Sequence, residues 1–426
     1  MRRILFSGDG SGGDLIPLVL MAREFKRAGY DVCVCGSSEH SRIASDFGVP
    51  FEGYPHNYSE IYLENQRLGY IHNIRENIRH QEMLFQGEFD VLSKIAPDYD
   101  VLINFLAEIF VPSIAEAYGL PNIKLYTFPM VRSDRHGPPT GLPIVTENKH
   151  LNRLQWWAVV FAARHLFSYN DTVNRLRAQL NLPPAGDLLT DNANCDHMMI
   201  GLYEELMPPC PTWNRIDHTY IGPCIPSDDA RLSDELEAFL GRGSQPIYVG
   251  FGSMRHANAD ELTRTILTAV RDVGVRVVLA QASSKIGSGL EGRDDVYLLK
   301  EYPIPHHILF PRLKAAVHHG SWITTHLAAR AGIPQLVLPQ ASDQYQWADR
   351  ISTAGLGPKG VDMNRMRPHK LSAAIAQLVQ REDYAVNANA LGDRVRGIDG
   401  PKNAVALFER IKGGLEAGKP VRVALP

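Results

Sequence analysis

The first fifty residues alternate between short apolar runs and one stretch with helical spacing. Residues 3–6 are apolar enough for a buried strand, and residues 7–13 form a glycine-rich turn. Between residues 14 and 28, apolar side chains recur every three or four positions, which predicts a helix with one buried face. Gly29 ends that helix, and residues 31–35 are the next predicted strand.

The same alternation continues in both halves of the chain. Such an order of strands and helices is typical of parallel sheets with helices on both faces. The further predicted strands are 100–105, 123–126, 247–251, 276–281, 317–319 and 335–339, and the further predicted helices are 109–118, 260–273 and 324–331.

The middle of the chain separates these two halves. Residues 148–182 have a helical, aromatic pattern, and five prolines then fall between Pro208 and Pro226. A cluster of prolines marks a boundary, because proline interrupts both helices and central strands. A length of 426 residues also suits two domains.

Composition excludes several classes of protein. Lysine and arginine number 44 against 47 acidic residues, a net charge of −3, which argues against nucleic-acid binding by general basicity. No apolar run approaches the ~18 residues of a membrane span. The N-terminal apolar run stops at Ser7, too early for a secretory signal. The five cysteines are scattered, and Cys33 and Cys35 suit a buried reduced pair. We therefore expect a cytoplasmic protein.

Histidines and acidic residues do not form a metal-binding pattern. The pairs at 306–307 and 318–319 are adjacent, and neighbours on a strand face opposite sides. Asp98 and Asp100 follow Pro97 just before a predicted strand, which favours a solvated turn over a metal–nucleotide motif. We expect no metal ion.

The glycine loop Gly8-Asp9-Gly10-Ser11-Gly12-Gly13 contains a G-x-G-x-x-G pattern between a strand and a helix. In a dinucleotide-binding protein this pattern brings a pyrophosphate to the helix N-terminus. Here Asp14 would place a carboxylate beside that anion, and the strand at 31–35 ends without an acidic residue for a ribose. The dinucleotide interpretation is therefore disfavoured.

Asp14 has two interpretations. An aspartate at a helix start caps free N–H groups and suits the helix dipole. It also lies at the carboxyl end of the first strand, where open α/β sheets bind ligands, and there it would serve as a general base.

Three turns in the second half also follow strands. The segment 317–325 runs from a strand through Gly320 into a helix near Thr324, which suits either a phosphate site or an ordinary threonine cap. Asp343 and Gln344 follow another strand and suit either sugar hydroxyls or a helix start. A Gly/Ser turn follows residues 247–251. Together the three turns can surround one ligand.

These turns and their order resemble those of GT-B glycosyltransferases of family 1, which include bacterial antibiotic, sterol and glycolipid glycosyltransferases. Residues 247–254 are similar to the start of the family's donor domain, and residues 301–311 to the loop that holds the nucleotide base. Residues 318–325 resemble its H-H-G-G-A-G-T-T diphosphate motif. Residues 338–344 resemble its P-x-x-x-D-Q sugar motif, and residues 10–17 its G-S-x-G-D-x-x-P. The resemblance spans nearly the whole chain.

The resemblance implies an α/β protein of the GT-B fold, with two Rossmann-like domains facing across a cleft. The acceptor-binding domain is expected at 1–222, a proline-rich linker at 223–243 and the nucleotide-sugar-binding domain at 244–403. Residues 404–426 would form a C-terminal helix and tail that return to the N-terminal domain.

The resemblance also implies roles for individual residues. Asp14 would deprotonate the acceptor within the glycine loop of Gly10, Ser11, Gly12 and Gly13, and His319 would also be catalytic. The implied donor-binding residues are Ser253, Ile304, His319, Gly320, Ser321, Trp322, Thr324, Asp343 and Gln344. Aromatic residues of the first half, among them Phe128, Trp156 and Trp157, suit either a flat acceptor pocket or the core.

One motif departs from the family pattern. Ser321-Trp322-Ile323 stands where the family has Gly-Ala-Gly. Because a β-branched Ile disfavours positive φ, we expect this loop to be reshaped, with altered or lost donor binding.

The resemblance implies an inverting transferase that moves a sugar from UDP or TDP to a hydroxyl of an apolar molecule such as a polyketide, macrolide, sterol or lipid. The nucleotide sugar would be a co-substrate, and no cofactor is expected. Two alternatives stay open: a GT-B sugar-nucleotide epimerase or hydrolase, and a catalytically silent sugar-nucleotide-binding partner. The sugar, the acceptor and a homodimeric state are not determined by the sequence.

Overall fold

Two parallel sheets form the centre of the protein. The computed structural model describes residues 1–58, 60–61, 74–105, 108–128, 130–140, 142–186, 195–226, 230–252, 258–281, 286–287, 290, 294–300 and 304–417. The first sheet has seven strands in the order β3-β2-β1-β4-β5-β6-β7, and the second has five in the order β10-β9-β8-β11-β12. Every strand pair in both sheets is parallel.

The seven-stranded sheet belongs to the N-terminal domain. Its strands are β1 (Arg3–Ser7), β2 (Asp31–Ser37), β3 (Phe51–Tyr54), β4 (Val101–Phe105), β5 (Asn122–Tyr126), β6 (His197–Ile200) and β7 (His218–Tyr220). The helices of this half are α1 (Gly12–Arg27), α2 (Ser41–Asp46), α4 (Ile74–Ile95), α5 (Val111–Tyr118), α6 (Lys149–His165) and α7 (Tyr169–Gln179).

The five-stranded sheet belongs to the C-terminal domain. Its strands are β8 (Ile247–Gly250), β9 (Val277–Ala280), β10 (Val296–Leu299), β11 (Ala315–His318) and β12 (Gln335–Val337). Its helices are α8 (Asp234–Leu240), α9 (Ala259–Val273), α10 (His306–Leu309), α11 (Trp322–Ala331), α12 (Gln344–Thr353), α13 (Pro368–Gln380) and α14 (Glu382–Val395), and the last described helix is α15 (Gly400–Glu416). Short 3₁₀ turns occupy Ser38–His40, Ala96–Asp98, Pro211–Arg215, Phe310–Arg312 and Met363–Arg365.

The alternation of strands and helices predicted from the sequence is confirmed, with most ends shifted by one or two residues. One such shift is at α11, which begins at Trp322 rather than at Thr324. Ser321 is its N-cap, and the side chain of Ser321 accepts a hydrogen bond from the backbone of Thr324. A serine cap and a tryptophan in the first turn are both compatible with a helix start.

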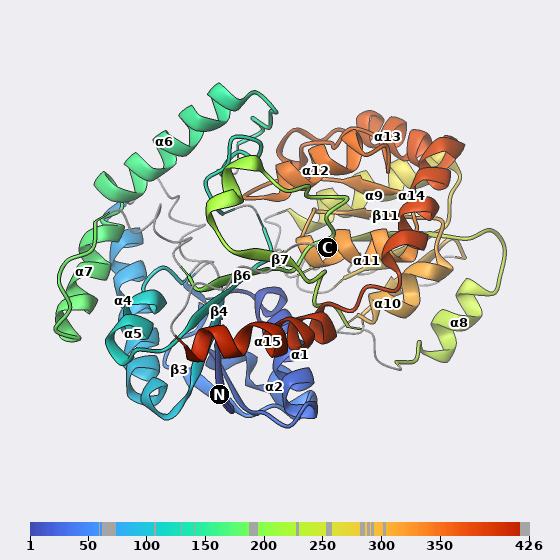
Figure 1. Ribbon diagram of the computed structural model, residues 1–426. Coiled ribbons are helices and arrows are strands. Elements are labelled where there is room, and N and C mark those ends of the chain that lie inside the picture. Colours follow the sequence, from blue (N-terminus) through green and yellow to red (C-terminus); the bar gives the residue numbers. More distant parts are fainter. Residues whose placement is uncertain are drawn as a thin grey trace.

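The helix α15 packs against the N-terminal domain although it follows the C-terminal domain in the chain. Figure 1 shows α15, in red, lying beside the blue α1. The ring of Phe408 in α15 contacts Phe25 edge-on at 5.4 Å and Tyr30 at 5.5 Å. Phe408, Leu407 and Ala404 are fully buried in the same core as β1 and α1. The N-terminal domain is therefore completed by a distant segment.

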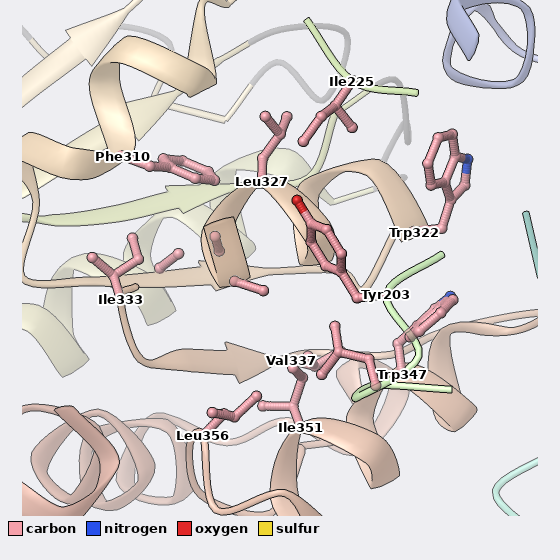
Figure 2. Close-up of a cluster of buried hydrophobic side chains, with 14 of the residues drawn as sticks. Tyr203, Ile225, Phe310, Trp322, Leu327, Ile333, Val337, Trp347, Ile351 and Leu356 are labelled. Carbon is pink, nitrogen blue, oxygen red and sulfur yellow. The ribbon is translucent and has the colours of Figure 1, made fainter. Parts of the chain in front are cut away.

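A second apolar core connects the two domains. It contains Tyr203 of the N-terminal domain and Ile225, which follows that domain, packed with Trp322, Leu327 and Trp347 of the second half. Figure 2 shows these side chains around α11. Such shared burial holds the domains in one arrangement.

The described helices include none that is long and apolar enough to cross a membrane. All five cysteines are free thiols, and Cys35, Cys210 and Cys224 are buried.

Candidate active site

The glycine loop and the start of α1 hold the carboxylate of Asp14 in a fixed position. The backbone N–H and the hydroxyl of Ser11 each donate a hydrogen bond of 2.8 Å to Asp14 Oδ2. Asp14 is the third residue of α1, so its charge also lies beside the unpaired N–H groups of the first turn. Asp14 is thus a helix-start residue, and its carboxylate is only partly exposed.

Gly10 provides the space that this carboxylate occupies. Gly10 has φ +144°, and a Cβ atom built on it would lie 2.7 Å from Asp14 Oδ2. A side chain at position 10 would therefore displace the carboxylate. Gly13, in the same loop, does not carry this constraint, since its nearest neighbour would be Ser11 Oγ at 3.5 Å. Gly12 faces His40, whose Nε2 donates to the carbonyl oxygen of Gly10 at 3.1 Å.

Burial raises the pKa of Asp14 above its ordinary 3.8. The hydrogen bonds from Ser11 oppose this rise, whereas the nearby carboxylate of Asp9 adds to it. A carboxylate with a raised pKa binds a proton more strongly, which favours the role of a general base.

A buried polar cluster lies behind the glycine loop. Glu108 Oε1 accepts hydrogen bonds from Ser7 Oγ at 2.6 Å and from the Tyr54 hydroxyl at 3.3 Å. Burial raises the pKa of Glu108 to about 8. Sequence reasoning missed this cluster, because isolated polar residues in apolar strands carry no motif.

Asp9, His56 and Glu88 form the other part of this cluster. Asp9 Oδ2 lies 3.1 Å from His56 Nε2, which in turn lies 3.9 Å from Glu88 Oε1. One donor atom from each of these residues falls within 4.8 Å of the others, close enough for a divalent cation. Burial, followed by the charge of Asp9, raises the pKa of Glu88 well above its ordinary value. A proton on Glu88 would reduce the negative charge of this cluster by one.

The turn between β11 and α11 is built around Gly320. Its φ is +92°, and a Cβ atom there would lie 2.6 Å from Val337 and 3.3 Å from the backbone of Gln344. The N–H of Gly320 donates to His318 Nδ1 at 3.1 Å, and His318 Nε2 lies 3.0 Å from Gln335 Oε1. Burial lowers the pKa of His318 to about 4, so the ring is neutral and can accept this bond. His318 supports the turn, a role that the sequence motif did not reveal.

His319 and Thr324 lie on either side of Gly320, with His319 just before it and Thr324 in the first turn of α11. Ser321 Oγ donates to Thr324 Oγ1 at 2.9 Å, and both residues belong to the N-terminal turn of α11. His319 is buried, with 7% of its surface exposed, and its ring lies beside Gly252 at the end of β8. Free N–H groups of a helix start and hydroxyl donors together suit an anion.

The departure Ser321-Trp322-Ile323 does not strain this turn. Ile323 lies within α11, and the described non-glycine residues with positive φ are Ser168, Asn181 and Ser342. The expectation that Ile323 would force a reshaped backbone is wrong, because Gly320 alone supplies the positive φ. Trp322 is 5% exposed and packs in the core between the domains (Figure 2). Its carbonyl oxygen lies 2.7 Å from His326 Nδ1.

Asp343 and Gln344 stand at the start of α12. The Trp347 indole N–H donates to Asp343 Oδ2 at 2.7 Å, and Gln344 Oε1 accepts from the backbone of Gln340 and Ala341. Burial raises the pKa of Asp343 to about 6, and the negative charge of Asp14 contributes to this rise. The structure therefore brings Asp14 of one domain near Asp343 of the other.

The remaining predicted residues are more dispersed. Ser253 lies outside the described residues. Ile304 packs against the core between the domains, and its carbonyl oxygen accepts from the N–H of His306. Phe128 is partly buried beside Phe105, with 5.6 Å between the rings. Trp156 is buried and donates its indole N–H to the carbonyl oxygen of His136 at 2.8 Å, whereas Trp157 is 59% exposed. Trp156 and Trp157 therefore do not face the same surroundings.

The helix α12 also joins the two domains, which the sequence did not predict. Gln346 Nε2 donates a hydrogen bond of 2.5 Å to the carbonyl oxygen of Gly137. The Arg350 guanidinium donates to His136 Nδ1 at 3.1 Å and lies 3.5 Å from Glu147 Oε1. Burial lowers the pKa of His136 to about 4, so its Nδ1 is free of a proton and accepts this bond. The same helix thus carries Asp343 and the contacts between domains.

Comparisons with known proteins agree with this architecture. Residues 264–409 match the family model of the erythromycin biosynthesis protein CIII-like C-terminal domain. The solved structure of the glycotransferase of kitacinnamycin has a TM-score of 0.73 at 17% identity, with 96% of this chain and 98% of that chain covered. The two parallel α/β domains therefore have the GT-B glycosyltransferase fold.

Sequence relatives identify the family. The glycosyltransferase GtfC of Amycolatopsis orientalis is 31% identical over 421 residues, which cover 95% of this chain and 97% of GtfC. The vancomycin aglycone glucosyltransferase of the same organism is 30% identical over 411 residues, with 95% and 97% covered. The chain belongs to the family 1 GT-B glycosyltransferases and transfers a sugar to a small molecule.

Proposed function

We propose that this enzyme transfers a sugar from a UDP- or TDP-sugar to a hydroxyl group of an apolar small molecule, with inversion at the anomeric carbon. Asp14 is the general base in this proposal. The observation that carries it is the position of Asp14, which is fixed by Ser11 in one domain and lies near Asp343 in the other. In this proposal Asp14 serves as the base and Asp343 binds the sugar, so each domain contributes one carboxylate to the reaction.

The reaction follows from this arrangement. The acceptor oxygen attacks C1 of the sugar from the face opposite the diphosphate, and its proton passes to Asp14. The bond between C1 and the diphosphate oxygen breaks as the new bond forms, so the configuration at C1 inverts. Because burial raises the pKa of Asp14, the carboxylate takes the proton more readily than an exposed aspartate would.

The leaving diphosphate gains one negative charge near α11 when its bond to C1 breaks. Backbone N–H groups of the first turn, the Thr324 hydroxyl and the His319 ring are the donors that would stabilise it. In this proposal these groups take the place of a metal ion, and the nucleotide sugar is the only co-substrate. The turn that holds these donors requires glycine at position 320, because φ is +92° there and a Cβ atom would lie 2.6 Å from Val337.

Asp343 and Gln344 would bind hydroxyl groups of the donor sugar. Gln344 Oε1 accepts hydrogen bonds from the backbone of its own loop, which holds the side chain at the start of α12. The contacts of Gln346 and Arg350 with the N-terminal domain begin one turn further along the same helix. In this proposal α12 both binds the sugar and contacts the N-terminal domain. The domain contact beside the sugar would exclude water from the reacting carbon.

A product analysis tests this proposal. The enzyme is incubated with α-linked UDP-glucose or TDP-glucose and a panel of polycyclic alcohols, with and without EDTA. We expect a β-glucoside, identified by proton NMR, in equal yield with and without EDTA. An α-glucoside would contradict inversion, and loss of activity in EDTA would contradict the metal-free mechanism. Release of free glucose without any glycoside would favour a hydrolase.

A further inference from the structure

The helix α6 presents an apolar face to solvent. Ten large apolar residues are exposed in the described part of the chain, and seven of them fall between residues 142 and 166. Trp157 is 59% exposed, Leu154 58% and Phe161 47%. A soluble protein seldom leaves so many large side chains uncovered in one place unless they bind something. The seven residues, which we call the α6 patch, are Leu142, Ile144, Leu151, Leu154, Trp157, Phe161 and Leu166.

The patch faces away from the body of the protein. Asn152, Trp156 and Ala163 form the buried face of α6. With 3.6 residues per turn, Leu154 and Phe161 lie about half a turn from that face. Figure 1 shows α6 along the outer edge of the N-terminal domain. The rings of Trp157 and Phe161 stack at 5.4 Å, so these two outward side chains form one apolar surface.

The charges of α6 have one sign. Between residues 149 and 165 the helix contains Lys149, Arg153 and Arg164 and no acidic residue. Arg153 pairs with Asp134 at 2.6 Å, whereas Lys149 and Arg164 make no ion pair with any described residue. Arg153 and Arg164 are about three turns apart and border the patch on the side of Trp157. The surface is therefore apolar along its centre and basic along one edge.

We propose that the α6 patch binds the surface of an anionic lipid membrane. A helix with tryptophan, phenylalanine and leucine on its outward face and basic residues beside them is the pattern of an interfacial helix. Trp157 stands at the border between the apolar and basic parts, where an indole ring suits the headgroup region. A symmetric pairing of α6 with a second copy is disfavoured, because it would bring Lys149 and Arg164 of both copies together and α6 contains no acidic residue to pair with them.

Trp157 provides a direct probe of this binding. The other four tryptophans, Trp156, Trp213, Trp322 and Trp347, are at most 6% exposed. A blue shift of the fluorescence on adding vesicles would therefore report on Trp157. The measurement needs neither donor nor acceptor, so its result is independent of the proposed sugar transfer.

The experiment compares vesicles of pure phosphatidylcholine with vesicles that also contain phosphatidylglycerol. We expect a blue shift and co-sedimentation with the anionic vesicles only, weakened by added salt. Trp157→Ser combined with Phe161→Ser should weaken the binding by about tenfold or more, since two large apolar side chains are lost. Arg164→Glu should weaken it as well. Val386→Ser, at an equally exposed apolar position in α14, should leave it unchanged.

Three results would overturn the proposal. The first is the absence of vesicle binding by the folded wild-type protein at low salt. The second is equal binding to both kinds of vesicle, unaffected by Arg164→Glu. The third is a wild-type dimer in analytical ultracentrifugation that the Trp157→Ser, Phe161→Ser variant converts to a monomer, which would assign the patch to a second copy.

Discussion

The carboxylate of Asp14 occupies the space that the missing side chain of Gly10 leaves. A Cβ atom at position 10 would lie 2.7 Å from Asp14 Oδ2, and the backbone there has φ +144°. Glycine at this position therefore determines where the base stands, although Gly10 itself carries no reactive group.

Gly10→Ala should reduce kcat strongly while the protein remains folded. The added methyl group collides with Asp14 Oδ2 and strains the backbone, so the carboxylate must move. We expect a loss of about 10²-fold, the size of effect that misplacing a catalytic group produces. Gly13→Ala is the matched control, because its methyl group would meet Ser11 Oγ at 3.5 Å without strain. Equal rates for the two variants would contradict this account of the loop.

Asp14→Asn should abolish transfer and leave donor binding intact. The amide can still accept the bonds from Ser11 but cannot take the acceptor proton. We expect kcat to fall by about 10²–10⁴-fold, with an unchanged thermal shift on adding nucleoside diphosphate. In the wild type, kcat should rise with pH through the raised pKa of Asp14, because the base works only when deprotonated. Full transfer activity of the Asp14→Asn enzyme would show that Asp14 is not the general base.

Arg350→Met should weaken the contact between the domains. The buried guanidinium donates to His136 Nδ1, and its removal leaves that nitrogen unpaired. We expect a loss of about 1.5–3 kcal/mol in the free energy of unfolding, seen as a lower midpoint in thermal unfolding. The donor KM should rise too, since α12 carries Asp343. Arg396→Met is the control, because Arg396 is exposed and pairs only within its own helix segment. An equal shift in both variants would argue against a domain contact.

Glu108→Gln should flatten the pH dependence of stability. The pKa of Glu108 is raised from 4.5 to about 8 in the folded protein. The stabilisation that protonated Glu108 adds to the free energy of unfolding is therefore complete below pH 4.5. This stabilisation is lost as the pH rises toward 8. The neutral amide can still accept from Ser7 and Tyr54 and does not titrate. Unfolding midpoints from pH 5 to 8 should fall less steeply in the variant than in the wild type, and parallel curves would contradict the prediction.

The sequence was sufficient for the elements and for the order of the motifs, because both are local. Apolar spacing predicted β1 and α1, and Gly320 and Thr324 were identified within a strand–turn–helix pattern. The same local reasoning failed at Ile323, since it assigned a need for positive φ to the wrong position of the turn. Position 320 supplies that conformation, and only the packing against Val337 reveals it.

The contacts of α12 with the N-terminal domain could not be predicted. Gln346 and Gly137 are 209 residues apart, and neither position belongs to a recognisable motif. His318 belongs to the segment that resembles the diphosphate motif but received no role from it, because its bond to Gln335 depends on the pairing of β11 with β12. Trp157 offered the same aromatic signal as Trp156, and only the direction of α6 separates the exposed ring from the buried one.

The packing of α15 against α1 has a consequence for how the protein is made. The ribosome completes the first half of the chain long before α15 is synthesised, yet Leu407 and Phe408 belong to the core of that first half. Part of the apolar surface of the N-terminal domain therefore stays uncovered until the second domain has been translated. A chimera that exchanges domains between related enzymes must accordingly move α15 together with the first half of the chain.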